Sequence, residues 1–274
     1  MNSQIFNVEC ITSKTNSTVV KIGKLTNKKY RKEEKLFVLN GIKLFSEAYN
    51  FGAEIAYIVL NENTDFSQDL INKISILKGK GTHILCVSDA VFSKLTEENA
   101  PQGIITVCRY LDIHNFACSK VCLNKCETVV ALESVRDPGN MGAILRNAAA
   151  FGVDRIVMSS DCADIYSSKV LRATMGAIFK VKIDVSADFE NALESIKNSG
   201  RRVIATTLGE NSMRLGECEI NKSDVFVIGN EGHGISENVI SLSDETMFIP
   251  MCENTESLNA AIASAIIMWE MYCL

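Results

Sequence analysis

The segment SVRDPGNMGAILRNAAAFGVD, residues 134–154, decides the fold of the second half of this chain. An apolar run, TVVALESV at residues 128–135, leads into it, and a second apolar run, RIVMSS at residues 155–160, follows it. Between the two runs, apolar residues recur at the spacing of a helix. A strand, a helix and a strand in this order predict two parallel strands, because the helix carries the chain back across the sheet.

The same alternation continues through the rest of the second half and predicts a mostly parallel sheet covered on both faces. The final helix is too apolar for a lone surface helix, so we expect it to pack in a core or against a partner subunit. The expected elements are a helix at 168–179, a strand at 181–185, a helix at 189–200, strands at 202–207, 224–230 and 247–250, and a helix at 257–274.

The first half of the chain predicts a separate, smaller α/β domain over residues 1–112. Residues 113–127 have no clear period and are expected to form a linker or an edge element before the second domain at residues 128–274. The elements expected in the first domain are helices at 14–35, 42–52, 69–81 and 90–98 and strands at 35–41, 54–62, 83–89 and 100–110.

The composition fits two domains, each with a core of its own. The chain has 274 residues, of which 47% are hydrophobic and 22% charged, and its mean hydropathy is +0.10. These values argue against disorder, and no apolar run reaches the ~18 residues that a membrane span needs. The first residues, MNSQIFNVEC, lack the layout of a signal peptide, so we expect a cytoplasmic protein whose ten cysteines stay reduced.

The net charge of −5 hides a basic stretch at residues 14–35. This stretch has eight lysine and arginine residues against two glutamates, a balance of +6, so the remainder of the chain sums to −11. A basic stretch on an acidic protein predicts contact with a polyanion, and an ordinary solvated helix face is the alternative. The residues expected to make such contacts are Lys28, Lys29, Arg31 and Lys32.

Three cysteines spaced by four residues suggest a zinc site: Cys118, Cys122 and Cys126, with His114 nearby. Structural zinc sites usually combine one close pair of cysteines with a second pair further along the chain. The sequence has no such arrangement here, so it predicts no metal site.

Three glycine-bearing segments follow strands of the second domain, at the positions where parallel sheets bind ligands. In the first, Gly139 and Gly142 lie at a predicted helix N-terminus, whose free N–H groups attract anions. A dinucleotide-binding turn with Asp161 as the ribose-binding acid is the alternative, although the segment lacks G-x-G-x-x-G. Arg146 stands out in the apolar helix that follows, either as a surface arginine or as one aimed at a phosphate or a ribose oxygen.

The second segment is VIGNEGHGIS, residues 227–236, and the third is IPMCENTESLNAAIASAI, residues 249–266. Three glycines within six residues indicate that the second segment passes close to a ligand. Glu231 lies between these glycines with little side-chain company, so it is either a solvated loop acid or a functional one. In the third segment, Ser257 or a neighbour is expected to cap the last helix.

Together and in this order, SVRDPGNMGAILRNAAAFGVD, VIGNEGHGIS and IPMCENTESLNAAIASAI resemble the three motifs of the SpoU (TrmH-type) RNA ribose 2′-O-methyltransferases of the SPOUT superfamily. In the first domain, KLTNKKYRKEEKLFVLNG and APQGIITV resemble that family's substrate-binding domain, a small ribosomal-protein-like α/β fold. Two positions depart from the family pattern: Asn40 stands where many relatives have glutamate, and Glu253 where many have glycine.

The resemblance implies a C-terminal α/β domain whose parallel sheet is tied in a deep trefoil knot, S-adenosylmethionine held in that knot, an RNA substrate and a homodimer. Two-domain relatives favour ribosomal RNA over transfer RNA. Carried over position by position, the resemblance assigns catalysis to Asn140, Arg146, Glu231, Ser257 and Asn259. It assigns the cofactor to Leu208, Gly209, Gly229, Asn230, Gly232, Gly234, Ile249, Met251 and Leu258.

An RNA 2′-O-methyltransferase is therefore the expected function. A nucleotide-dependent oxidoreductase is disfavoured because the chain has no G-x-G-x-x-G, and a non-catalytic RNA-binding relative because the polar motif residues are all present. In this family, the arginine of the first motif is proposed to act as the general base, and the matching residue here is Arg146. We expect it instead to bind a phosphate and stabilise the developing alkoxide, because an arginine pKa lies far above neutral pH. Glu231 is then expected to hold Arg146 or to relay the proton.

Overall fold

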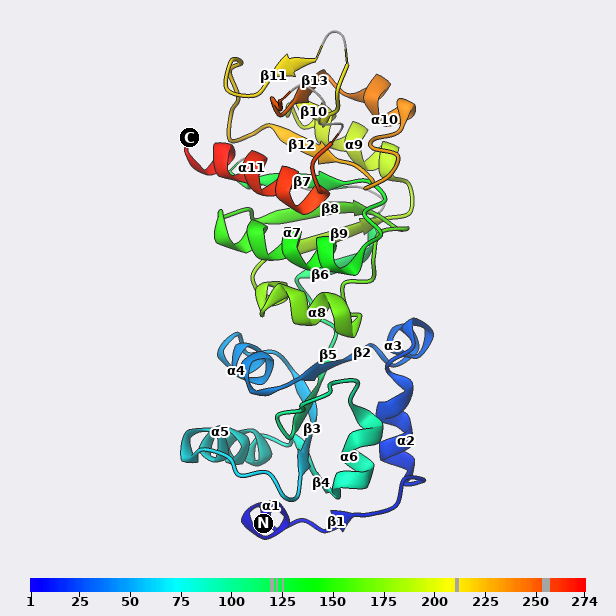
Figure 1. Cartoon of the computed structure of the whole chain (residues 1–274), viewed down its shortest axis with the longest axis vertical. Helices are drawn as coiled ribbons and strands as arrows, with labels where there is room; N and C mark the ends of the chain where they lie inside the picture. The colour runs from blue at the N-terminus through cyan, green and yellow to red at the C-terminus, as the bar shows by residue number, and fades with distance from the viewer. Residues whose placement is uncertain (119–120, 122, 125, 210–211, 253–256) are drawn as a thin grey trace. The chain divides into compact units, whose positions relative to one another are not determined.

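A computed structural model gives the structure of the chain and describes residues 1–118, 121, 123–124, 126–209, 212–252 and 257–274. The chain forms two compact units (Figure 1). Unit 1 comprises Met1–Leu111 with Tyr166–Phe179, and unit 2 comprises Asp112–Ile165 with Lys180–Leu274. Among the described residues, no helix has both the length and the apolar character needed to cross a membrane.

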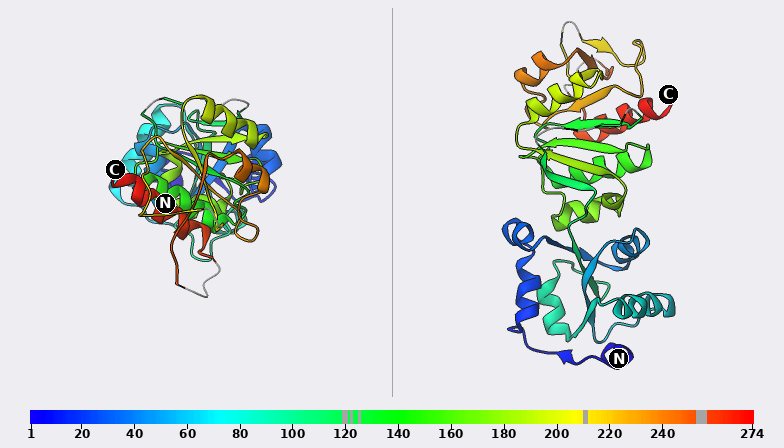
Figure 2. Two further views of the ribbon diagram at one scale, coloured as in Figure 1. Left: turned by 90° about the horizontal axis from the view of Figure 1, so that it is seen from above. Right: turned by 180° about the vertical axis from the view of Figure 1, so that it is seen from behind.

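Unit 1 is built on a mixed five-stranded sheet with the order β1-β4-β3-β5-β2. Strands β1, β4 and β3 run parallel, and β5 runs antiparallel to its neighbours β3 and β2. Helices α2 and α6 pack on one face, and α4 and α5 lie on the other (Figures 1 and 2). Its elements are α1 (Asn2–Phe6), β1 (Cys10–Ile11), α2 (Ser17–Lys24), α3 (Lys28–Glu34), β2 (Leu36–Asn40), α4 (Ile42–Asn50), β3 (Ile55–Asn61), α5 (Gln68–Gly79), β4 (His83–Val87), α6 (Asp89–Leu95), β5 (Ile104–Arg109), α8 (Ser168–Thr174) and the 3₁₀ turn η1 (Ala177–Phe179).

The single helix expected over residues 14–35 is two helices, α2 and α3. Asn16 and Asn27 begin them, since each Oδ1 accepts hydrogen bonds from backbone N–H groups of the following turn. An asparagine in the middle of a basic run therefore starts a new helix, because its side chain competes for backbone N–H groups that a continuous helix would use. The sequence did not predict the short elements α1 and β1.

Unit 2 is built on an eight-stranded sheet with the order β11-β13-β10-β12-β7-β8-β9-β6, in which every neighbouring pair is parallel. Helices α9 and α10 pack on one face, and α7 and α11 cover the other side by side (Figure 2). The fold class expected from the sequence is thus confirmed. The elements are β6 (His114–Cys118), β7 (Val129–Leu132), α7 (Pro138–Ala150), β8 (Arg155–Ser159), β9 (Lys182–Ser186), α9 (Phe189–Asn198), β10 (Val203–Thr206), β11 (Met213–Arg214), β12 (Val225–Ile228), α10 (Glu237–Leu242), β13 (Glu245–Phe248) and α11 (Ala260–Tyr272).

For residues 113–127 the structure confirms the edge-element alternative, and for residues 166–179 it differs from the sequence expectation. Residues 113–127, expected as a linker or edge element, contain β6, which pairs with β9 at the edge of the second sheet. The segment Tyr166–Phe179 groups with unit 1, where Tyr166 stacks on Phe37 with ring centroids 4.2 Å apart. The helix expected at 168–179 ends at Thr174, because Met175 and Gly176 both adopt positive φ, 51° and 96°.

The zinc site considered for the cysteines near residue 120 falls partly outside the described residues. Cys122 is not described, and neither is the side chain of Cys118. Of the other two side chains, His114 is buried in β6 and Cys126 is exposed.

Candidate active site

The glycine-bearing loops of unit 2 gather at the carboxyl ends of β7, β12, β10 and β13, which lie in parallel within one sheet. This edge of a parallel sheet is the usual place for a ligand site, because the loops that leave it open a crevice between successive helices. The β7–α7 loop, the β12–α10 loop and the residues before α11 supply the polar groups described below.

The β12–α10 loop is a closed turn whose shape depends on Gly229. A Cβ added to Gly229 would lie 2.4 Å from backbone atoms of Gly234, so no other residue fits without displacing the loop. Asn230 and Gly234 exchange both backbone hydrogen bonds, at 2.8 and 3.0 Å. Asn230 Oδ1 also accepts from the N–H groups of Gly232 and His233, at 2.9 and 3.0 Å. The loop is therefore held in one conformation by its own backbone.

Glu231 at the tip of this loop joins the motif residues into one polar cluster. Its carboxylate accepts hydrogen bonds from Asn140 Nδ2 at 3.0 Å and from the backbone N–H groups of Asp137 and Arg136 at 3.2 and 3.4 Å. Asn140 Oδ1 in turn accepts a hydrogen bond from Asn259 Nδ2 at 2.8 Å. Asn259 also caps α11, accepting from the N–H groups at the start of that helix. Three segments far apart in sequence are thus tied together by Glu231, Asn140 and Asn259.

The environment of Glu231 keeps its carboxyl ionised. Partial burial favours the protonated form, but the hydrogen bonds from Asn140 and from the backbone N–H groups outweigh that effect and lower its pKa. At neutral pH the side chain is a hydrogen-bond acceptor and a weak base. Its position suits it to hold the β7–α7 loop in place.

A second polar cluster, centred on Asp161, holds the β7–α7 loop through hydrogen bonds. Asp161 accepts hydrogen bonds from Ser134 Oγ, Arg136 Nη2 and Ser159 Oγ, each at 2.7 Å. Burial alone would raise its pKa, but these three donors lower it to about 2. Ser134 has a positive φ of 53°, and its carbonyl accepts a hydrogen bond from Asn230 Nδ2 at 2.8 Å. Asp161, considered from sequence as a ribose-binding acid, is thus engaged with its own loop.

A pocket with a volume of about 310 Å³ lies beside the Glu231 cluster, a size within the range of small-molecule sites. Its lining combines aliphatic side chains with the glycine loop, which suits a ligand that has both an apolar ring face and polar groups. The lining includes these residues expected to bind the cofactor or take part in catalysis: Leu208, Gly229, Asn230, Glu231, Gly232, Gly234, Ile249, Met251, Ser257 and Leu258. Gly209 does not line it. Thr206, Thr207, Met247 and Phe248 line it without having been expected.

Among the described residues, Arg146 makes no hydrogen bond or ion pair with the Glu231 cluster. It is exposed on α7, and within the described part of the chain we find no hydrogen bond or ion pair to its guanidinium. The neighbouring Asn147 instead donates to the carbonyl of Ala261 at 3.1 Å and joins α7 to α11. Of the two departures from the family pattern, Asn40 ends β2 with its Oδ1 buried and, within the described part of the chain, without a hydrogen-bond partner, and Glu253 lies outside the described residues.

The expected RNA contacts in unit 1 divide into two groups. Lys28, Lys29 and Lys32 are exposed on α3. The expectation for Arg31 is wrong, because its side chain is 4% exposed and its Nη1 donates to the carbonyls of Leu25 and Thr26 at 2.7 and 2.6 Å. These carbonyls are left free at the end of α2, so Arg31 serves that helix terminus.

The fold and the pocket define an α/β protein with a pocket of small-molecule size at the carboxyl edge of a parallel sheet. Residues 127–269 match the SpoU rRNA Methylase family, and residues 16–106 match the MRM3-like substrate binding domain. The chain therefore belongs to the SpoU rRNA methylase family and is a methyltransferase. This confirms the family that the three motifs indicated.

Similar proteins cover nearly the whole chain. A 23S rRNA (guanosine(2553)-2′-O)-methyltransferase of Bacillus subtilis is 29% identical, over 95% of this chain and 98% of its own length. An uncharacterized tRNA/rRNA methyltransferase of Synechocystis is 30% identical, over 96% and 93%. The crystal structure of an AdoMet-bound rRNA methyltransferase from Sinorhizobium meliloti is 29% identical, with a TM-score of 0.83 over 96% and 97% of the two chains.

Proposed function

We propose that this chain transfers a methyl group from S-adenosylmethionine to a ribose 2′-hydroxyl of ribosomal RNA. The observation that carries the proposal is the hydrogen-bonded cluster of Asn140, Glu231 and Asn259 beside the pocket, since this cluster joins one residue from each of the three motifs. The names of the Bacillus subtilis and Sinorhizobium meliloti relatives support the same reaction and the same methyl donor. The match to a substrate-binding domain over residues 16–106 supports RNA binding by unit 1.

The residues of the pocket fit the proposed methyl donor. Leu208, Ile249, Met251 and Leu258 offer the apolar surface that an adenine ring needs, and the glycine loop after β12 offers backbone polar groups without side-chain obstruction. S-adenosylmethionine supplies an already activated methyl group when bound. The protein must then orient the ribose hydroxyl and assist the loss of its proton.

We assign Arg146 to electrostatic stabilisation. An arginine guanidinium loses its proton only far above neutral pH, which disfavours Arg146 as a general base. An exposed guanidinium without a partner among the described residues is free to bind an RNA phosphate by two parallel hydrogen bonds. Bound in this way, its charge stabilises an alkoxide that forms on the adjacent ribose.

We assign Glu231, Asn140 and Asn259 to orienting the site. The ionised Glu231 holds the first turn of α7 through Asn140 and two backbone N–H groups. Ser257 lines the pocket next to this cluster and is placed to contact the ribose or the methyl donor. In this arrangement Glu231 accepts hydrogen bonds from the protein, and the proton of the 2′-hydroxyl passes to solvent.

We further propose a homodimer, a knotted C-terminal sheet and a cytoplasmic location. Unit 2 exposes Ile262, Trp269 and Tyr272 on α11, and the two aromatic rings lie 5.9 and 6.2 Å from that of Phe151 at the end of α7. An exposed aromatic cluster of this kind fits a subunit interface. The knot follows from family membership, and a reducing compartment suits a chain with ten cysteines.

Calorimetric titration with S-adenosylmethionine, S-adenosylhomocysteine and NAD tests the class of ligand, and mapping of 2′-O-methylation in total RNA with and without the gene tests the substrate. We expect binding of the first two ligands, no binding of NAD, and one ribosomal RNA position that loses its methyl group without the gene. Arg146→Ala should abolish turnover and leave donor binding measurable. Donor binding with no methylated position lost would favour a non-catalytic relative, and binding of NAD alone would favour an oxidoreductase.

A further inference from the structure

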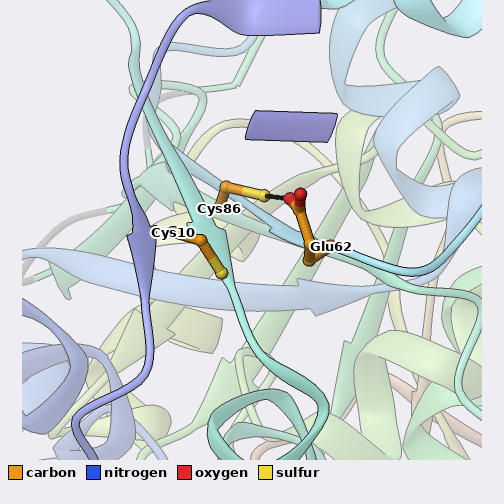
Figure 3. Close-up of side chains that lie close together, drawn as sticks. All are labelled: Cys10, Glu62 and Cys86. Atoms are coloured by element: carbon orange, nitrogen blue, oxygen red, sulfur yellow. Dashed lines mark hydrogen bonds between the residues drawn. The ribbon is translucent and has the colours of Figure 1, made fainter. Parts of the chain in front are cut away.

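Two cysteines and a glutamate converge in unit 1, outside the methyl-transfer site. Cys10 comes from β1, Cys86 from β4, and Glu62 follows β3 directly, so three neighbouring strands contribute one side chain each. The two Sγ atoms and a carboxylate oxygen lie within 4.8 Å of one another (Figure 3). Among the described residues this is the one group of cysteine, histidine or acidic side chains that meets so closely.

We propose that Cys10, Glu62 and Cys86 bind a thiophilic divalent cation of the zinc type. Thiolate sulfur and carboxylate oxygen are both ordinary zinc ligands. Tetrahedral geometry with Zn–S bonds of about 2.3 Å separates two sulfurs by about 3.8 Å, so the two Sγ atoms need to approach by at most about 1 Å. Two sulfur ligands favour such an ion over Mg²⁺ or Ca²⁺, which prefer oxygen ligands.

The burial of the three residues fits an ion that keeps one open coordination position. Cys86 is fully buried, whereas Cys10 and Glu62 are half-buried. The exposed side leaves room for water as the fourth ligand beside three protein ligands. On binding, the two thiols release their protons to solvent and the sulfurs bind the cation as thiolates.

The carboxylate of Glu62 is already oriented by a second residue. Ser3 donates to it twice, from its backbone N–H at 2.9 Å and from its Oγ at 2.6 Å. Cys86 Sγ donates a hydrogen bond to the same carboxylate. Outer contacts of this kind fix the direction of a ligand before the ion arrives and lower the cost of ordering it.

The ion would attach the N-terminal segment to the sheet. Strand β1 has two residues and pairs only at the sheet edge, where Cys10 and Ile11 lie opposite Cys86 and Val87. A bridge from Cys10 to Cys86 and Glu62 adds a tie between β1 and the two strands beyond it. The ion would therefore tie β1 to the sheet, and this effect is independent of the proposed methyl transfer.

Cobalt titration of the full-length chain tests the proposal, because thiolate-to-cobalt charge transfer reports sulfur ligation directly. The chain is kept in a phosphine reductant, and Cys118, Cys122, Cys126, Cys218, Cys252 and Cys273 are replaced by serine to remove competing thiols. We expect one cobalt ion per chain, displaced by zinc, and a higher melting temperature with zinc bound. Loss of one sulfur should weaken binding by more than the roughly 10- to 100-fold that changes in outer contacts cost.

Matched variants decide which residues are responsible. Cys10→Ser and Cys86→Ser should each abolish the charge-transfer band, Glu62→Gln should weaken binding, and Ser3→Ala should weaken it about 10-fold. Cys108→Ser is the control, since Cys108 is buried in β5 of the same sheet and takes no part in the cluster. Cys10 is half-buried in an edge strand, so its variant stays informative if Cys86→Ser does not fold. No saturable band, a band that survives Cys10→Ser, or a Cys10–Cys86 disulfide that persists in the reductant would each overturn the site.

Discussion

Gly229 is the residue of the proposed donor pocket that leaves least room for a side chain. In Gly229→Ala the new Cβ would lie 2.4 Å from the backbone of Gly234, so the loop must open. We expect a destabilisation of about 1–3 kcal/mol, as for other overpacked sites, and at least a tenfold loss of affinity for S-adenosylmethionine by calorimetry. Gly232→Ala is the control, because its nearest neighbour is Asn230 Oδ1 at 3.6 Å. Equal affinities of the two variants would contradict the proposed donor site.

The Asp161→Asn variant tests whether the hydrogen bonds between Asp161 and the β7–α7 loop matter for turnover. The side chains of Arg136 and Asp161 are 64% and 43% exposed, so we expect Asp161→Asn to change stability by less than about 1 kcal/mol. Its effect on kcat should be larger, between about 10- and 100-fold, because the loop that contacts Glu231 loosens. A purely structural role would instead lower the melting temperature and leave kcat unchanged.

The pH dependence of the Asp161 contribution follows from its depressed pKa of about 2. A carboxyl with a lowered pKa stabilises the folded state above its unfolded pKa of ~3.9, and this contribution is lost as the pH falls towards 2. Between pH 5 and pH 8 the wild type and Asp161→Asn should therefore differ by a constant ratio of kcat. A ratio that changes across this range would point to a titrating partner instead.

At the residue scale, the motifs pointed to Asn140, Glu231 and Asn259, which meet in the structure, and did not predict how these side chains pair. Glu231 was expected to hold Arg146 or relay a proton, whereas in the structure it holds Asn140 and the loop backbone. Such pairings depend on side-chain directions in segments about ninety residues apart, which motif spacing does not encode. The burial of Arg31 could not be predicted either. A run of basic residues predicts exposed side chains, and it does not show that the carbonyls of Leu25 and Thr26 lie within reach of Arg31.

Helix α3 carries the basic residues that remain available for RNA. Replacement of Lys28, Lys29 and Lys32 by alanine should raise the KM for RNA and reduce the slope of log K against log salt, by up to about 0.9 for each RNA phosphate that is no longer neutralised. Donor affinity should not change, because the pocket residues all lie in unit 2. Binding at several salt concentrations measures both effects. Wild-type affinity and slope in the triple variant would exclude α3 from the RNA interface.

A buried ion network joins the starts of three central strands of unit 2. Arg155 binds both Glu127 and Asp184, at 3.1 and 2.6 Å, and Lys182 binds Glu127 at 2.7 Å. Burial raises the pKa of Glu127, but its bonds to Arg155 and Lys182 outweigh burial and lower it to about 2. Glu127→Gln should cost about 3 kcal/mol at pH 7, because Arg155 is left buried with one partner fewer.

The pH dependence of unfolding tests the sign of the contribution that ionised Glu127 makes to stability. Its folded pKa lies below the ordinary value, so its contribution is complete above about pH 4.5 and is lost as the pH falls towards 2. The difference in urea midpoint between wild type and Glu127→Gln should therefore shrink between pH 5 and pH 3. A difference that stays constant over this interval would show that Glu127 contributes by packing rather than by charge.

At the element scale, the strands and helices with strong periodicity could be predicted, the edge strand β6 was one of two alternatives for its segment, and the break between α2 and α3 could not be predicted. The buried strands β3, β7, β8 and β12 and helices α7 and α9 lie where apolar patterning placed them. Strand β6 has a mixed polar sequence, and only its pairing with β9 makes it a strand. The break between α2 and α3 follows from Asn27, whose side chain caps α3, a choice that residue spacing alone leaves open.

At the scale of the whole molecule, a division into two continuous domains assigns one segment to the wrong unit. Residues 166–179 connect two adjacent strands of the second sheet, yet they pack within unit 1, where Tyr166 is buried against Phe37. Sequence order favours assigning such a segment to the sheet that flanks it. Only the contacts of its buried aromatic ring reveal the other assignment.

The proposed dimer is the property of the whole molecule that most needs a direct test. Trp269 is 51% exposed and lies within 6.1 Å of Tyr272, ring to ring, so this face of α11 carries aromatic surface without cover in a single chain. Obligate dimers bury roughly 2,000 Å² or more, and a charge at the centre of such an area removes most of its stability. Trp269→Glu should therefore turn a dimer into a monomer in light scattering at micromolar concentration. Ile76→Glu is the control, because Ile76 on α5 is comparably exposed, at 47%, and belongs to unit 1. A wild-type monomer would contradict the proposed dimer. Dissociation of both variants would contradict the proposed interface, since it would show that an added charge in either unit is enough to separate the subunits.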